Sequence, residues 1–168
     1  LELTPQATVE SSFGRKGSGF GEFADILSIA RDSLGRLWIL DAKNKRVSKF
    51  LIKREAKGLP QSVFPEASWS FVPYNRRGLP DHVNKIVAPL ASNQIWIAVG
   101  GKDPSIITQD SRGNLSNLGK IKDENGAMIK LASLDSIETS ADASELYVLE
   151  GKKSRILRLD AKELKTLN

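Results

Sequence analysis

The side chains best suited to catalysis are few and scattered in this sequence. Its sole histidine is His82, in a stretch that reads LPDHVN and places Asp81 directly before it. A carboxylate can orient a histidine as a general base, but adjacent residues rarely face each other in that way. One histidine also cannot supply the paired ligands of a zinc site, and the chain has no cysteine. The sequence therefore predicts no catalytic residue, no metal site and no cofactor.

Basic residues are the more conspicuous group. The chain carries 25 Lys and Arg against 20 Asp and Glu, which gives a net charge of +5. Many of the basic residues fall between apolar stretches, where loops are expected. They are Arg15, Lys16, Lys43, Lys45, Arg46, Arg76, Arg77, Lys102, Lys152, Lys153 and Arg155. These residues are either ordinary solvated loop residues or a basic face that attracts an anionic partner.

Short apolar strands separated by polar turns would position these residues. The stretch Leu37–Leu40 recurs as Ile95–Ala98 and again as Leu146–Leu149. Each copy follows an apolar strand and a polar turn, and each precedes a loop and another apolar strand. The copies recur at intervals slightly longer than the ~40–50 residues of a β-propeller blade. Evenly spaced strands also suit an antiparallel sandwich, so the periodicity alone leaves both folds open.

The first copy, from Phe13 to Phe50, has the most specific pattern. A Gly-rich stretch ending in Phe leads to an apolar strand and an Asp-x-x-Gly turn. An aromatic-aliphatic strand ending in Asp then leads to Asn-x-Arg. The residues are Gly19 with Phe23, Ile26–Ile29, Asp32 with Gly35, Trp38–Asp41, and Asn44 with Arg46. This order resembles one blade of the NHL-repeat β-propellers, although the two later copies lack the turn and Asn-x-Arg signatures.

The resemblance implies an all-β fold, a β-propeller of about three four-stranded blades that is a partial propeller or half of a larger one. The expected blade units are residues 7–67, 68–117 and 118–160, with 161–168 as a short helical turn or fraying tail. The outer strand of each unit is expected to come first in the chain. The three outer strands are Ala7–Phe13, Ser68–Pro73 and Leu118–Lys122.

Aromatic residues recur at the spacing of the repeat. Trp38, Trp96 and Tyr147 occupy the same position in their copies. Such recurrence favours packing between neighbouring blades over a platform for a ligand. We therefore expect all three to be mostly buried, with Leu40 and Leu149 on the same face.

Propellers host unrelated activities, so the fold does not fix the function. The sequence favours a non-catalytic interaction or scaffold module that binds a protein partner. The alternative is an RNA-binding propeller that uses the basic face, since some NHL propellers bind single-stranded RNA. Its loops offer only Phe20 and Tyr74 for base stacking. A third candidate is a degenerate calcium-dependent propeller hydrolase, but only Asp25 and Asp135 precede inner strands where several carboxylates would be needed.

Three blades are too few to close a circle, because propellers typically have ~4–8. The expected partners are therefore further blades, from the same parent chain or from a second copy joined head to tail. Leu1 in place of Met, and the well-preserved first copy, favour the former. No run of ~18 apolar residues predicts a membrane span. The lack of cysteine suits the cytoplasm as well as a bacterial envelope or secreted location.

Overall fold

The computed structural model describes residues 12–53, 62–70, 83–89 and 94–167. Three antiparallel sheets form the framework of the described residues, and a small pair of strands, β1 (Arg15–Lys16) and β2 (Glu22–Phe23), precedes them. The fold is all-β and forms part of a β-propeller, as predicted. The described part of the chain contains no helix with the length and hydropathy that a membrane span requires.

Each sheet is one blade, built from strands that follow one another in the chain. The first blade comprises β3 (Ile26–Arg31), β4 (Leu37–Asp41), β5 (Arg46–Lys53) and β6 (Ser62–Ser70). The second comprises β7 (Val83–Val87), β8 (Ile95–Val99), β9 (Ser105–Gln109) and β10 (Leu115–Asn117). The third comprises β11 (Ser136–Thr139), β12 (Glu145–Glu150) and β13 (Arg155–Asp160).

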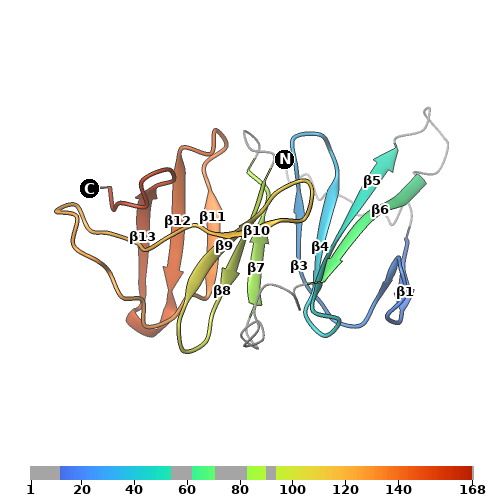
Figure 1. Cartoon of the computed structure of the whole chain (residues 1–168), viewed down its shortest axis with the longest axis horizontal. Helices are drawn as coiled ribbons and strands as arrows, with labels where there is room; N and C mark the ends of the chain where they lie inside the picture. Colours follow the sequence, from blue (N-terminus) through green and yellow to red (C-terminus); the bar gives the residue numbers. More distant parts are fainter. Residues whose placement is uncertain (1–11, 54–61, 71–82, 90–93, 168) are drawn as a thin grey trace, which may run out of the picture.

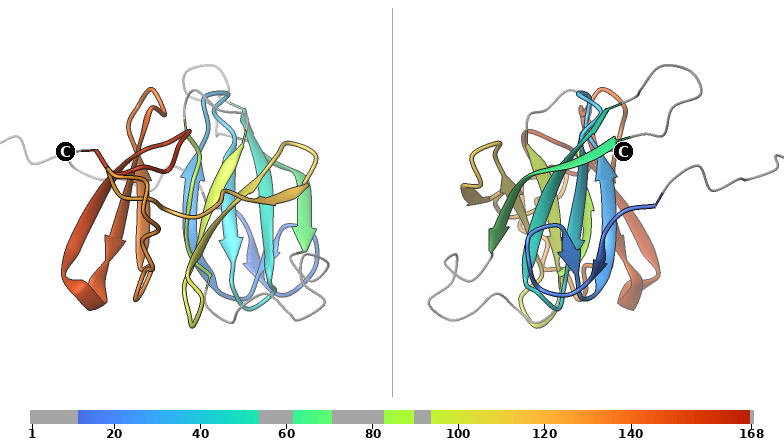
Figure 2. Two further views of the ribbon diagram at one scale, coloured as in Figure 1. Left: turned by 60° about the vertical axis from the view of Figure 1, so that its left-hand side comes forward. Right: turned by 90° about the vertical axis from the view of Figure 1, so that its right-hand side faces the viewer.

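The blades meet through their first strands. Strand β7 contacts β3 on one side and β11 on the other, and Figure 1 shows these three strands next to one another. The connections β4–β5, β8–β9 and β12–β13 therefore lie at the same end of the molecule, at the lower edge in Figure 1. Figure 2 shows the third blade, in red and orange, at one side of the other two.

Two of the outer strands, Ser68–Pro73 and Leu118–Lys122, were assigned wrongly from the sequence. Ser68 to Ser70 belong to β6, which pairs with β5 and runs past the expected boundary at residue 67. The outer strand of the second blade is β10, which, like β6 in the first blade, comes last in the chain and pairs with the strand before it, β9. Strands that follow one another in the chain are usually neighbours in a sheet, so the fourth strand follows the other three. The expected strand Ala7–Phe13 lies outside the described residues except at its end, where Phe13 packs against Phe50 at 5.4 Å between ring centroids.

The C-terminal segment folds back instead of fraying. Asp160 accepts hydrogen bonds from the backbone N–H groups of Lys162 and Glu163, which turns the chain after β13. Thr166 then bridges Leu159 of β13. Ala161 and Leu164 are buried in the core. Leu118–Lys122 is not an outer strand of the third blade, because within it only Lys122 forms bridges, to Met128 and Lys165.

Apolar side chains fill the two joints between blades. Trp38, Leu40 and Val47 of the first blade pack against Ile86 and four further aliphatic residues of the second, which are Ile95, Ile97, Val99 and Ile107. The other face of β8 carries Trp96 and Ala98, which pack with residues of the third blade that include Leu146 and Val148. Trp38 is 1% exposed and Trp96 is 6% exposed, which confirms the burial expected for both.

Candidate binding surfaces

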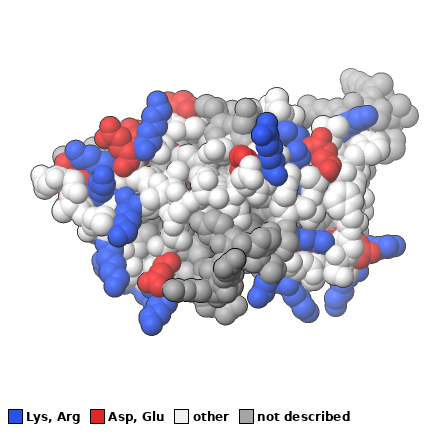
Figure 3. Space-filling view, viewed as in Figure 1, with Lys and Arg blue, Asp and Glu red and all other residues white. Residues whose placement is uncertain are grey.

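Three connections at one end of the blades carry exposed basic side chains. They are Lys43 and Lys45 between β4 and β5, Lys102 between β8 and β9, and Lys152 and Lys153 between β12 and β13. Figure 3 shows Lys and Arg side chains along this lower edge, with Asp and Glu side chains among them. Five residues of the expected basic face therefore lie at one end of the blades. Arg76 and Arg77 lie outside the described residues.

Other residues of the expected basic face hold the first blade together. The Arg46 guanidinium donates hydrogen bonds to the backbone oxygens of Ser18, Gly19 and Glu22, at 2.8, 2.9 and 2.6 Å. Arg15 pairs with the Glu22 carboxylate at 2.7 Å, and neighbouring Lys16 is exposed in β1. The Asn-x-Arg signature thus fixes the Gly-rich stretch against the blade, which leaves Arg46 little capacity for a partner.

A buried carboxylate neutralises part of the basic end. Arg155 donates to Glu150 at 2.6 Å, and the Lys153 ammonium lies 3.4 Å from the same carboxylate. Burial raises the pKa of Glu150, but the backbone N–H of Ala132 and these two cations outweigh it and leave the pKa below its ordinary value. Arg155 and Lys153 are therefore committed to this carboxylate.

The Asp-x-x-Gly turn, from Asp32 to Gly35, has a structural role. Asp32 accepts hydrogen bonds from the backbone N–H groups of Leu34 and Arg36, and from the Trp38 indole N–H at 2.8 Å. Burial raises the pKa of Asp32, but hydrogen bonds from Trp38 and Arg36 lower it below its ordinary value. The same turn recurs at Asp110–Gly113 and at Asp123–Gly126. Neither turn was predicted from the sequence, because each lies at a different place in its blade from the first turn.

Of the two carboxylates expected near the inner strands, that of Asp135 has structural partners. Asp135 accepts hydrogen bonds from the Ser133 hydroxyl at 2.6 Å and the Gly151 N–H at 2.7 Å, which lower its pKa. Asp25 donates its backbone N–H to Asp41. Among the described residues, no cluster of three or more His, Asp and Glu could hold a metal ion. Asp81 and His82 lie outside the described residues.

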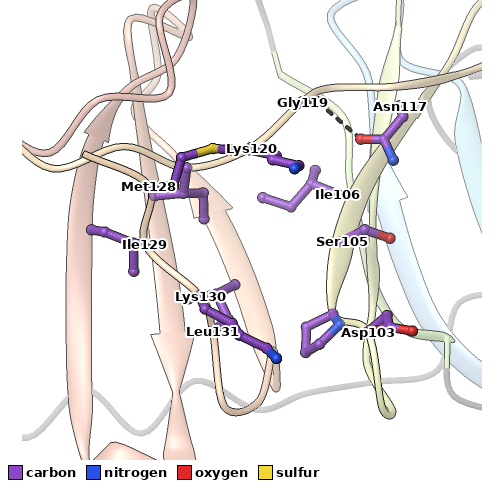
Figure 4. A pocket seen from close by; sticks show the side chains of 12 residues that line it. Asp103, Ser105, Ile106, Asn117, Gly119, Lys120, Met128, Ile129, Lys130 and Leu131 are labelled. Atoms are coloured by element: carbon purple, nitrogen blue, oxygen red, sulfur yellow. Dashed lines mark hydrogen bonds between the residues drawn. The ribbon is translucent and has the colours of Figure 1, made fainter. Parts of the chain in front are cut away.

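A cavity of about 730 Å³ lies between β9 and the segment that leads to the third blade. Its apolar lining includes Ile106, Ile129 and Met128, and Figure 4 shows the side chains of Lys120 and Lys130 on either side of it. These residues were not predicted from the sequence, because they come from different strands and loops and form no local motif.

The register of the strands identifies equivalent positions in the three blades. Trp38 lies opposite Ala30, Trp96 opposite Val87 and Tyr147 opposite Glu138, each on the first two strands of its blade. The side chains at these positions lie on the face that packs against the next blade. In the third blade we call this the forward face, and it comprises Glu138, Tyr147, Leu149 and Ile156.

The forward face is exposed where its counterparts are buried. Leu40 and Ala98 are fully buried, whereas Leu149 at the same position is 40% exposed. Tyr147 is only partly buried, and Ile156, opposite Leu149, is 67% exposed. Leu149 lies on the same face as Tyr147, as expected, but Tyr147 is less buried than Trp38 and Trp96. The reason is that no described part of the chain packs against this face.

Comparison with known proteins agrees with the fold. No protein-family model and no curated protein matches the sequence. Among solved structures, Sqt1 from Chaetomium thermophilum, a WD40-type propeller, superposes with a TM-score of 0.50 at 12% identity. The match covers 82% of this chain and 31% of Sqt1, so the chain spans about a third of that protein's length. The chain therefore has the fold of part of a β-propeller.

Two further structures give weaker superpositions. Chaetomium thermophilum Sqt1 bound to the N-terminus of ribosomal protein L10 has a TM-score of 0.49 at 14% identity, over 81% of this chain and 32% of that one. Kuenenia stuttgartiensis hydrazine synthase has a TM-score of 0.44 at 10% identity, over 99% of this chain and 52% of that one.

Proposed function

We propose that the chain is a non-catalytic interaction module, in which NHL-like blades form a scaffold that binds a protein partner. The forward face is the observation that carries this proposal. Leu149 and Ile156 expose aliphatic side chains to solvent at the side of the third blade. Contiguous exposed apolar surface is typical of sites that another protein covers, because its burial contributes roughly 25 cal/mol per Å².

The polar groups support a structural role for the described carboxylates. Asp41 is fully buried and accepts hydrogen bonds from the backbone N–H groups of Ala24, Asp25 and Asn44. Asp32 and Glu150 are held in the same manner. A general acid or base needs a group that is free to exchange a proton with substrate. These three carboxylates are instead part of the hydrogen bonding of turns and strands.

Site-specific photo-crosslinking tests the proposal. A photoreactive amino acid in place of Tyr147 is expected to give protein adducts in cells of the parent organism, because a bound partner would cover the forward face. The matched control carries the same amino acid in place of Leu34, which is exposed in the β3–β4 turn. Equal adducts at both positions, or none at position 147, would contradict the proposal.

RNA binding remains a second candidate, favoured by the exposed Lys43, Lys102 and Lys152 at one end of the blades. This candidate predicts that single-stranded RNA is retained on filters at low salt and released steeply as salt rises, because phosphate contacts release counterions. Alanine at these three positions should reduce both the affinity and the salt dependence. No retention by the unmodified chain at low salt would refute RNA binding.

A further inference from the structure

The first blade exposes a second face that complements the forward face. We call it the rear face, and it comprises Leu27, Ile29 and Arg31 of β3. Ile29 lies opposite Ile39, as Ile86 lies opposite Ile97 and Ile137 opposite Val148. Each of these isoleucines therefore belongs to the face that packs against the preceding blade.

Burial distinguishes the rear face from its two counterparts. Ile86 and Ile137, each covered by a preceding blade, are 0% and 1% exposed. Ile29 is 58% exposed, and Leu27 beside it is 46% exposed. Further from β3, the same side of the first blade is closed by the chain itself, because Phe23 packs on Phe50 at 5.6 Å between ring centroids. What stays open is the inner strand, through which the other blades meet.

We infer that the forward face of one copy binds the rear face of a second copy, so that two chains join head to tail into a ring of six blades. This inference rests on the proposed function and names the partner. Both joints of such a ring would repeat the contact between β3 and β7 within the chain, with β11 of one copy against β3 of the other. Six blades lie within the ~4–8 that close a propeller.

The two open faces carry opposite charges at equivalent positions of the proposed joint. Within the chain, Ala30 of the first blade and Ala88, just after β7, both pack in the joint between the first two blades. The equivalent positions on the two open faces are Glu138 and Arg31, both exposed. The head-to-tail joint would place their opposite charges near each other. A contact between two forward faces would bring Glu138 against its own copy instead.

Symmetry accounts for both open faces at once. A head-to-tail contact uses two different surfaces, and a ring closes when rotation brings the last free surface onto the first. With two copies, each forward face meets a rear face and neither is left in solvent. A ring of two copies would therefore bury four apolar side chains that are exposed in a single copy, those of Leu27, Ile29, Leu149 and Ile156.

Sedimentation velocity of the chain at several concentrations tests the inference. The unmodified chain is expected to sediment as a dimer that dissociates on dilution. Leu149→Asp and Ile29→Asp should each raise the dissociation constant at least ~10-fold, because each places a charge in both joints. Leu34→Asp, on the exposed β3–β4 turn, is the control and should leave the dimer unchanged.

Mixing the two variants distinguishes head-to-tail from face-to-face contact. Leu149→Asp retains an intact rear face and Ile29→Asp an intact forward face, so an equimolar mixture can form one undamaged joint. Such a mixture should therefore associate more tightly than either variant alone. Should a variant lose its fold, as judged by circular dichroism, the charge exchange Glu138→Arg with Arg31→Glu in one chain should dimerise more tightly than either single change.

Other outcomes would overturn the inference. A monomer at all concentrations would contradict it, as would assemblies larger than a dimer, because these would show that the ring does not close. Photo-crosslinks from position 147 to a protein of another mass would leave the proposed function standing while refuting a second copy as partner. The two failures are therefore distinguishable.

Discussion

Replacing Trp96 with alanine is expected to lower the free energy of unfolding by about 3–5 kcal/mol. Its indole is 6% exposed and packs in the cluster between the second and third blades, with Ala98 and Val148 among its members. Truncation removes apolar contacts and leaves a cavity that rigid neighbouring strands cannot fill. Urea denaturation followed by circular dichroism would measure the change.

The matched control is Tyr147→Ala, at the equivalent position of the third blade. Tyr147 is only partly buried, and no described part of the chain packs on its outer side. Its truncation should therefore cost less than half as much in the monomeric chain. If both variants lost the same stability, the assignment of Tyr147 to an open face would be wrong.

The second large effect is expected for Asp32→Ala, which should cost about 2–4 kcal/mol. The substitution removes the acceptor of the buried Trp38 indole N–H and of the backbone N–H groups of Leu34 and Arg36. A buried donor without an acceptor carries the full cost of its lost hydration. Thermal unfolding of the purified variant would test the expectation.

Asp110→Ala is the control for this prediction. Asp110 shapes the same kind of turn through the N–H groups of Arg112 and Asn114, but these hydrogen bonds are exposed to solvent. Water can replace the lost acceptor there, so we expect a clearly smaller loss. If Asp110→Ala lost as much stability as Asp32→Ala, the hydrogen bonds of the turn, and not the bond to the Trp38 indole, would account for most of the effect at Asp32.

The repeat of Trp38, Trp96 and Tyr147, taken together with the specific pattern of the first copy, predicted the blades, because stacked blades favour a large apolar or aromatic side chain at each equivalent position. It was insufficient for the outer strands. A short strand such as Leu115–Asn117 has little apolar periodicity, and only the tight turn at Asp110–Gly113 indicates that it pairs with β9. The lower burial of Tyr147, compared with Trp38 and Trp96, was not predicted, for a different reason. Repeat position specifies which neighbour a side chain faces, but not whether that neighbour is present.

The basic face was predictable only in part. The connectivity of antiparallel strands places Lys43, Lys102 and Lys152 at one end, and this follows from strand order alone. Strand order does not predict that Arg46 and Arg155 are bound within the folded chain. Arg46 binds backbone oxygens more than 20 residues away in the chain, and Arg155 binds a carboxylate that only the folded blade buries. Charge counted along a sequence includes such residues among those free to bind.

The returning C-terminal segment has a consequence for how any other chain could approach the third blade. The backbone N–H of Leu167 donates to the oxygen of Arg158, and that of Asp160 donates to the oxygen of Lys165. These bonds occupy the C-terminal part of the free edge of β13, a position where an added strand would otherwise extend the sheet. Strand addition of the kind that builds fibrils is thereby hindered at this part of the edge. A second chain that approaches this part of the blade would recognise its side chains, which is a selective mode of contact, and not its main chain, which would accept almost any extended segment.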